Sequence, residues 1–308
     1  MTLQAPSGHI RPETITQTFY AILRAEVVSG NPYLDKDEQA RLRGHYPFIM
    51  DFKRYPSELV SAIYGSRRIC PVQSILDSSN PLVFDAGCGY GSDSFLFAAL
   101  GAKVLAVDVS TEKTEIAQKR KHYYEKMLGK SLDVRFGAAD LNGYAPEDAD
   151  ISLTWLSSVL AIIENQDAFL DRIYQATRTG GKIMIVDFNL WNPHFLLAEW
   201  RRRRRALTRS PEFVRHANFW AMVRRKKRRG AFFFPQDGGG LFDDVQFFTP
   251  GTLCRLLKQI GFRLLPPGFS GFAPPFLFKG LSAHAENFFS HVPILRNLGR
   301  AYVVTGVK

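Results

Sequence analysis

The residues best suited to chemistry follow the apolar run that starts at Leu82: an acid at Asp85, then glycines at Gly87, Gly89 and Gly91. Such a run is typical of a buried parallel strand, and residues 92–100 then read as a helix. Glycines let a backbone turn tightly and approach a ligand closely. A carboxylate at the tip of the strand suits a cationic amine. The segment therefore predicts a ligand-binding loop between a strand and a helix.

A second acid supports a nucleotide-like ligand. Asp108 closes the next apolar strand, 103–107, seventeen residues after Gly91. An acid at this place can bind ribose hydroxyls. The glycine order is G-x-G-x-G rather than the dinucleotide order G-x-G-x-x-G, and Asp85 lies where a pyrophosphate would need neutral or positive surroundings. Both features disfavour NAD.

At these residues the chain resembles the class I S-adenosylmethionine-dependent methyltransferases, whose first motif is an acid followed by x-G-x-G-x-G and whose second strand ends in an acid. The resemblance implies S-adenosylmethionine as cofactor and S-adenosylhomocysteine as product. It places Asp85 near the methionine moiety, the three glycines against the cofactor through their backbone, and Asp108 on the ribose. The further cofactor contacts that it implies are Val109 and Asp140 at the adenine, with Leu141, Trp155 and Leu156 nearby.

Each residue also has a purely structural interpretation. Gly87 and Gly89 can serve a tight turn alone, and Asp108 and Asp140 can cap helices. Relatives such as the aminopropyl transferases use the same fold with a modified cofactor. A cofactor-binding protein without transfer activity is a further alternative.

The acceptor atom depends on the general base, because a hydroxyl must lose its proton whereas other acceptors need alignment only. Many small-molecule members of the family carry a histidine after strand four in a pattern like V-L-x-H-I, and Ile162 replaces it here. Asp187 and His194, which flank the turn after strand five, are the candidate bases, ahead of Glu164. An acid bonded to backbone amides and a packed histidine are the structural alternatives.

The order of the elements predicts an α/β fold: a seven-stranded, Rossmann-like, mostly parallel sheet with helices on both faces. The expected strands are 82–86, 103–108, 132–136, 150–154, 182–188, 262–265 and 301–307, the last one antiparallel by the family resemblance. The expected helices are 92–100, 111–128, 166–178 and 250–260. We predict four regions: an N-terminal helical cap, 1–80; the cofactor-binding core, 81–190; a basic insertion, 191–246; and the C-terminal part of the core sheet, 247–308.

The composition is that of an ordinary globular protein of 308 residues, with 45% hydrophobic residues. Its three cysteines are widely spaced and fit no metal pattern, so we expect no metal and a reducing compartment. The chain shows no secretion signal and no apolar stretch of membrane-spanning length. We therefore expect a cytoplasmic protein, at most peripheral at the cytoplasmic face of the membrane.

The net charge of +11 comes from one segment, because residues 191–230 hold thirteen Arg or Lys against two Glu. The arginine runs 201–205 and 224–229 lie beside aromatic residues, and the apolar residues before the first run fit one helix face. Such a segment suits an anionic membrane surface. It also suits phosphates of nucleic acid, with Phe219 and Trp220 available for stacking. A solvated basic insertion is the third interpretation.

Together these features predict methyl transfer to a small-molecule or lipid-linked acceptor, with oxygen as the expected acceptor atom. An RNA methyltransferase that uses the arginine-rich insertion is the main alternative. The stretch after strand four, Trp155-Leu156-Ser157, lacks the Asn/Asp-Pro-Pro-aromatic motif of enzymes that methylate exocyclic base amines. The sequence does not predict an oligomeric state.

Overall fold

The computed structural model of the chain describes residues 11–51, 57–144, 146, 150–189, 231–235, 244–270, 299 and 301–308. Residues 12–76 form four helices: α1 (Pro12–Ser29), α2 (Lys36–His45), α3 (Pro47–Met50) and α4 (Ser57–Leu76). Strands and helices then alternate through β1 (Leu82–Ala86), α5 (Ser92–Ala99), β2 (Lys103–Asp108), α6 (Thr111–Leu128), β3 (Val134–Ala138), β4 (Ile151–Ser157), the 3₁₀ helix η1 (Leu160–Ile162), α7 (Gln166–Ala176) and β5 (Thr177–Phe188).

The main sheet confirms the predicted fold class. Its strand order is β3-β2-β1-β4-β5-β10-β8, with β9 also pairing β10. Strands β1 to β5 are parallel, whereas β10 (Ala301–Val307) runs antiparallel to β5 and pairs with β8 (Arg263–Leu264) and β9 (Gly268–Ser270). The sheet therefore has one strand more than the predicted seven, because β9 adds a second short strand along β10.

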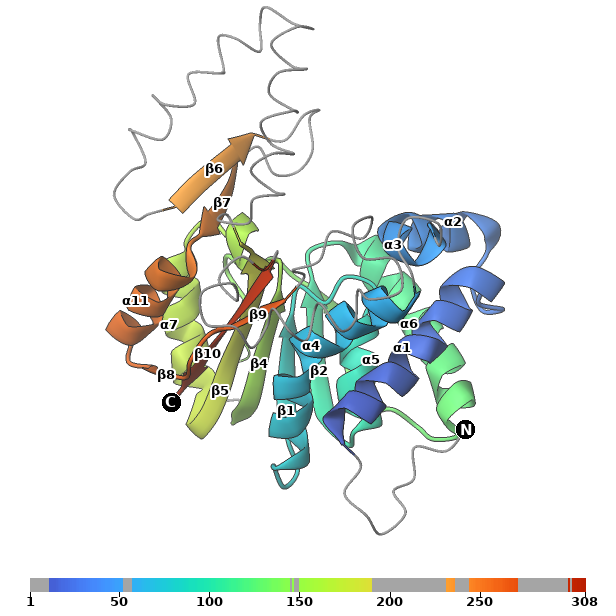
Figure 1. Cartoon of the computed structure of the whole chain (residues 1–308), viewed down its shortest axis with the longest axis horizontal. Coiled ribbons are helices and arrows are strands. Elements are labelled where there is room, and N and C mark those ends of the chain that lie inside the picture. The colour runs from blue at the N-terminus through green and yellow to red at the C-terminus, as the bar shows by residue number, and fades with distance from the viewer. Residues whose placement is uncertain are drawn as a thin grey trace, which may run out of the picture.

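Alternation along the strands divides the core into two layers. Val83 and Trp155 point to the layer that contains α5 and α6, and Phe84 and Leu156 point to the layer that contains α7 and α11 (Pro250–Ile260). Figure 1 shows the sheet between these two sets of helices. Both faces are covered, which explains why the parallel strands read as nearly continuous apolar runs.

The N-terminal helices α1 and α4 pack on each other and join the α5 and α6 layer, as Figure 1 shows. Ile15 and Phe19 of α1 and Val72 of α4 belong to the same buried cluster as Val83 of the sheet. These helices are thus continuous with the main core. The proposed boundary of a separate cap at residue 80 remains a prediction.

Several element bounds differ from the predicted ones. β3 lies two residues later than expected and β4 extends to Ser157. β5 begins at Thr177 rather than at 182, because Gly180 adopts a φ of +76° and the strand continues through a register irregularity opposite β4. Gly180 and Gly181 therefore lie in an irregular start of β5, and α7 ends at Ala176 rather than at 178.

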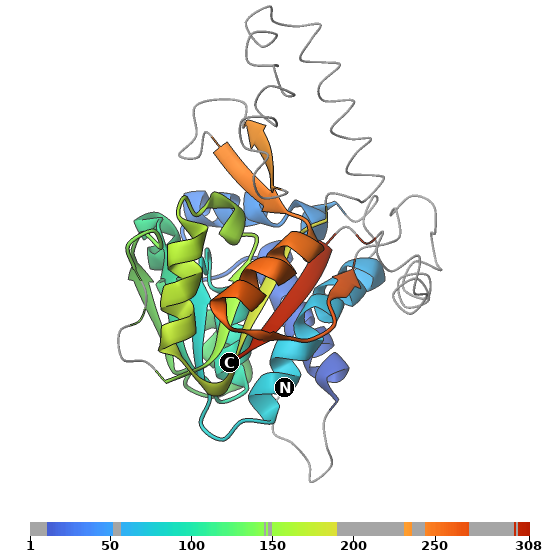
Figure 2. The same ribbon diagram turned by 90° about the vertical axis from the view of Figure 1, so that its left-hand side faces the viewer.

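A second, two-stranded antiparallel sheet joins β6 (Ala231–Pro235) to β7 (Asp244–Phe248). The sequence analysis does not predict this hairpin inside the basic insertion. β7 contacts η1, and the hairpin projects beyond the main sheet in Figures 1 and 2. No helix in the described ranges is long and apolar enough to cross a membrane.

Candidate active site

The loop after β1 is shaped by its three glycines, which all have positive φ: +77° at Gly87, +52° at Gly89 and +77° at Gly91. A Cβ at Gly87 would lie 2.2 Å from Val159 Cγ2, and one at Gly91 would lie 2.7 Å from the Phe136 ring. A Cβ at Gly89 would have no described atom within 4 Å. Two of the glycines thus permit close packing, and the third leaves open space above the loop. We call residues 87–91 the cofactor loop.

Asp108 fixes this loop over the end of β2. Its carboxylate accepts hydrogen bonds from the backbone N–H of Gly89 at 2.9 Å and of Ser110 at 3.0 Å. The N-cap of α6 is Ser110, whose hydroxyl accepts from the Lys113 N–H at 3.3 Å. Asp108 is therefore not the N-cap residue of α6. It lines the same open space as Gly89.

Asp85 is a buried carboxylate beside the loop. Its side chain accepts a hydrogen bond of 2.5 Å from the Ser94 hydroxyl. Burial, followed by the nearby charge of Asp93, raises the pKa of Asp85 to about 8. A cationic group placed here would favour the ionised carboxylate and reverse this shift.

Asp93 is a site residue that the sequence analysis missed. Arg68 of α4 binds its carboxylate through Nε at 2.6 Å and Nη2 at 3.0 Å, and Trp155 Nε1 donates to it at 2.9 Å. The Arg68 guanidinium also lies 3.7 Å from the centre of the Tyr64 ring. Asp93 in the first turn of α5 was visible in the sequence, but no local signal connects it to Arg68, twenty-five residues earlier.

These groups open into one cavity of about 530 Å³. Its floor contains Asp85, Gly87, Gly89 and Asp108, and its wall after β4 contains Ser157, Ser158, Val159 and Ile162. The helices α1, α3 and α4 supply six apolar lining residues, which we call the apolar roof: Leu23, Phe48, Ile49, Leu59, Val60 and Ile63. The same helices also contribute Tyr20, Tyr64, Arg67 and Arg68 to the lining. Ile162 thus faces the cavity at the position where many small-molecule relatives carry a histidine.

The lining also includes four tyrosines and a histidine: Tyr20, Tyr46, Tyr64, Tyr90 and His45. Its remaining polar residues include the cations Arg67, Arg68 and Lys113. The buried hydroxyl of Tyr64 has no hydrogen-bond partner within the described ranges. Burial, with the charges of Lys113 and Arg120, lowers the pKa of His45 to about 4. His45 is therefore neutral near pH 7 and adds no positive charge to the cavity.

The structure brings four of the predicted cofactor residues together, because Asp85, Gly87, Gly89 and Asp108 all line the cavity. The other six are absent from its lining. Gly91 packs against Phe136; Val109 and Asp140 are exposed; Leu141, Trp155 and Leu156 are buried in the core. Asp140 accepts hydrogen bonds from the backbone and side-chain N–H groups of Asn142 within a turn and caps no described helix. Cofactor contacts by these six residues stay predictions.

Of the two candidate bases, Asp187 and His194, the structure describes only Asp187. Asp187 is buried at the end of β5 and accepts a hydrogen bond of 2.7 Å from the Phe188 N–H. Burial raises its pKa to about 7. Asp187 does not line the described cavity. His194, the arginine runs, Phe219 and Trp220 lie outside the described residues, as does most of the basic insertion.

The floor of the cavity fits an adenosyl sulfonium. Asp85 offers a buried carboxylate to a cation, Asp108 offers oxygens to hydroxyls, and Gly89 leaves room for close approach. No group of three or more His, Cys, Asp or Glu suited to a metal ion occurs within the described ranges. The site thus has the residues for this organic cofactor.

Comparisons with known proteins agree with this geometry. Residues 83–181 match a family model described as a methyltransferase domain. A SAM-dependent methyltransferase from Methanosarcina mazei superposes with a TM-score of 0.52 at 15% identity, covering 77% of this chain and 97% of that one. At this identity the superposition shows the fold alone. Residues 83–181 therefore match a methyltransferase domain, and the surrounding fold is that of the superposed S-adenosylmethionine-dependent enzyme.

Two curated relatives match only part of the chain. Phosphoethanolamine N-methyltransferase 3 of Arabidopsis thaliana is 26% identical over 107 residues, 34% of this chain and 21% of that protein. Malonyl-[acyl-carrier protein] O-methyltransferase of Serratia marcescens is 28% identical over 111 residues, 35% of this chain and 40% of that protein. The chain therefore spans less than half the length of either relative.

Proposed function

We propose that the protein transfers a methyl group from S-adenosylmethionine to an oxygen of a small-molecule or lipid-linked acceptor that carries an apolar part. One observation supports this most directly: a carboxylate-bearing floor and the apolar roof face each other across one cavity. The floor suits the cofactor, and the roof favours apolar groups of an acceptor because burying them is favourable. Pockets of this size commonly take small ligands.

The chain's own residues would bind and align the two reactants. When bound, the cofactor supplies a methyl carbon made electrophilic by the sulfonium charge. Asp85 would hold its cationic part, Asp108 would hold its ribose, and the roof would keep water away from the acceptor. Alignment of this kind can supply a large part of the rate enhancement. The Serratia relative is named as an O-methyltransferase and the Arabidopsis relative as an N-methyltransferase, so the oxygen acceptor rests on the proposed general base rather than on the relatives.

We propose Asp187 as general base among the described residues, with His194 as the second candidate. Because Asp187 does not line the described cavity, this role requires the acceptor hydroxyl to reach the end of β5. The Asp187 pKa of about 7 allows this carboxyl to accept a proton near neutral pH. We expect Asp187→Asn to lower single-turnover transfer by about 100-fold or more and to leave the dissociation constant for S-adenosylhomocysteine unchanged. Glu164→Gln, at an exposed position, is the control and should transfer normally. Undiminished transfer by Asp187→Asn would exclude this role.

Methyl-labelled cofactor tests the acceptor class. The protein and labelled S-adenosylmethionine would be incubated with cell extract, which is then separated into lipid, small-molecule and RNA fractions, with Asp108→Ala as the inactive control. We expect label in the lipid or small-molecule fraction. Label in RNA would favour the alternative acceptor, and binding without any transfer would favour a cofactor-binding protein.

We also propose that residues 191–230 attract an anionic membrane surface, on the basis of their charge and aromatic residues. The full chain should sediment with vesicles that contain anionic lipids and remain free with neutral vesicles. Replacing the charges of 201–205 and 224–229 by glutamine should abolish sedimentation. Binding that survives these replacements would contradict the proposal, and preferential binding to RNA would favour nucleic acid as partner.

A further inference from the structure

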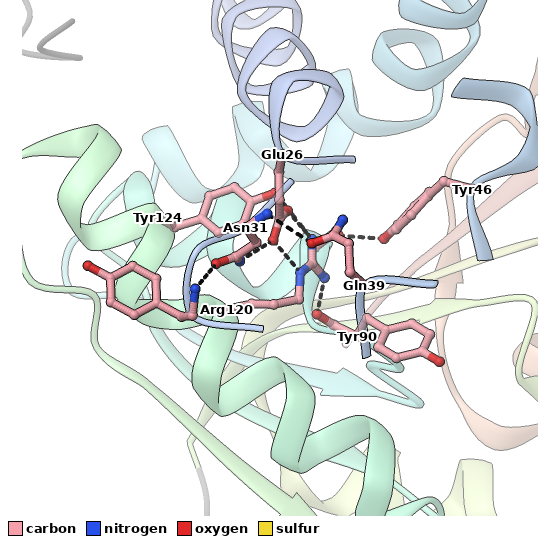
Figure 3. Close-up of polar contacts among 9 residues, drawn as sticks. Glu26, Asn31, Gln39, Tyr46, Tyr90, Arg120 and Tyr124 are labelled. Atoms are coloured by element: carbon pink, nitrogen blue, oxygen red, sulfur yellow. Dashed lines mark hydrogen bonds and ion pairs between the residues drawn. The ribbon is translucent and has the colours of Figure 1, made fainter. Parts of the chain in front are cut away.

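A fully buried ion pair joins the N-terminal helix to the core next to the cofactor loop. Arg120 of α6 binds Glu26 of α1 through Nε at 2.8 Å and Nη2 at 2.6 Å, and neither side chain is exposed to solvent. Ninety-four residues separate the two along the chain. Figure 3 shows the pair at the centre of a network of polar side chains.

The carboxylate of Glu26 is further satisfied by two neutral donors. Tyr124 donates its hydroxyl at 2.8 Å, and Asn31 donates its side-chain amide at 2.7 Å. Desolvating two charges is costly, so buried pairs of this kind are weak contributors to stability compared with apolar residues of similar volume. Stability alone is therefore a poor reason for an arginine at position 120.

The remaining donors of Arg120 reach the cofactor loop and the residue after it. Nη1 donates to the backbone carbonyl of Tyr90, and Nη2 donates to the Ser92 hydroxyl at 3.1 Å. The Tyr90 carbonyl directly follows Gly89, whose N–H is held by Asp108 on the other side. The loop at Gly89 is thus fixed from two directions, by Asp108 and by Arg120.

Ser92 links Arg120 to a residue of the cavity lining. Its hydroxyl shares a hydrogen bond of 2.5 Å with the hydroxyl of Tyr46, which follows α2 and lines the cavity. Burial lowers the pKa of Arg120, but the charge of Glu26, Tyr124 and the hydrogen bond to Glu26 together raise it well above its ordinary value. The guanidinium stays charged and keeps all its donors at neutral pH.

We propose that Arg120 is a positioning residue for the cofactor: held by Glu26, it fixes the loop at Tyr90 and Ser92 and links that loop to Tyr46 in the cavity wall. This role rests on the proposed function, because it concerns the binding of that cofactor. It predicts that the pair matters for cofactor affinity more than for folding. If the pair only attached α1 to α6, its loss would affect folding more than cofactor affinity.

Paired replacement separates the two roles. Glu26→Met with Arg120→Met removes both charges together, so no buried charge is left alone. We expect this variant to fold and to bind S-adenosylhomocysteine at least about tenfold more weakly by calorimetry. The amides of Gly89 and Gly91 should exchange their hydrogens at least about tenfold faster without any ligand. A folded double variant with wild-type affinity and wild-type exchange at these amides would overturn the proposal.

Two matched controls exclude a general effect of the helix contact. Lys119→Met removes the neighbouring, solvent-exposed ion pair to Glu38 of α2 and should change neither measurement. Tyr124→Phe removes a donor to Glu26 and a 3.3 Å acceptor of Arg120 Nη2, but it keeps the bonds of Arg120 to Tyr90 and Ser92. It should therefore lower thermal stability and leave affinity unchanged. Weakened affinity in both controls would instead show that any loss of the helix contact affects the site.

If the double variant does not fold, a second variant tests the positioning role of Arg120. Arg120→Lys keeps a charge for Glu26, but one ammonium group cannot reproduce the arginine fork toward the Tyr90 carbonyl and Ser92. Faster exchange at Gly89 supports the role, and unchanged exchange overturns it. Exchange needs no cofactor, so failure of the wild-type protein to bind S-adenosylhomocysteine would count against the proposed function alone.

Discussion

At the scale of single residues, the three loop glycines look alike in sequence but differ in their surroundings. Gly87 and Gly91 would bring a Cβ into contact with Val159 and Phe136, whereas Gly89 faces open space in the cavity. The motif therefore combines a packing requirement with a requirement for access. Substitutions at these positions should separate the two.

Gly87→Ala should lower the free energy of unfolding by about 3 kcal/mol or more, because strain at positive φ adds to the clash with Val159. Gly89→Ala should cost only about 1–2 kcal/mol, as should the control Gly129→Ala at the end of α6. Gly89→Ala should weaken S-adenosylhomocysteine binding, while Gly129→Ala should not. Urea denaturation and calorimetry measure both quantities. Equal stability losses at Gly87 and Gly129 would contradict the packing role.

The raised pKa of Asp85 leads to a prediction about proton release when the cofactor binds. With its pKa near 8, the carboxyl is mostly protonated at pH 7, and a bound cation favours its ionised form. Binding of S-adenosylmethionine should therefore release a proton, and affinity should rise between about pH 6 and about pH 8. Binding enthalpies in buffers of different ionisation enthalpy measure the release. Asp85→Asn should bind more weakly and lose the part of the release that Asp85 supplies; the same release in this variant would contradict the role.

At the scale of elements, the strands were predictable because the alternation of apolar segments and helices sets a parallel sheet. β1, β2, α6, α11 and β10 have the predicted bounds. The three-residue β9 was not predicted, since so short a strand leaves little periodic signal. The β6–β7 hairpin was not predicted either, although its strands are as long as β1. The pairs Arg68–Asp93 and Glu26–Arg120 could not be predicted either, because they join helices that only the tertiary fold brings together.

Helix α2 offers a test at this scale. Asp35 and Glu38 form a capping box, with Glu38 N to Asp35 Oδ1 at 2.8 Å and Asp35 N to Glu38 Oε2 at 3.0 Å. Asp35→Ala should lower the free energy of unfolding by about 1 kcal/mol. Since neither residue lines the cavity, S-adenosylhomocysteine affinity should not change. A large loss of affinity would show that the stability of α2 affects the position of Tyr46, which follows the helix, more strongly than these contacts indicate.

At the scale of the whole molecule, one fold presents a floor that carries the glycine motif and an apolar roof from the N-terminal helices. The floor was predictable because its residues follow strand ends in a fixed order. The roof was not, because α1, α3 and α4 give only helical patterns in sequence. We propose that the acceptor binds at that roof, whereas the sequence motif predicts the methyl donor.

The most direct test of the central claim is calorimetric titration of the full chain with S-adenosylhomocysteine, alongside Asp108→Asn. The cavity predicts one binding site in the wild-type protein and an affinity at least about tenfold lower in the variant, which loses a charged hydrogen-bond acceptor at the ribose position. Absence of binding by the folded wild-type protein, or equal affinity in Asp108→Asn, would contradict the assignment of this cavity to the cofactor.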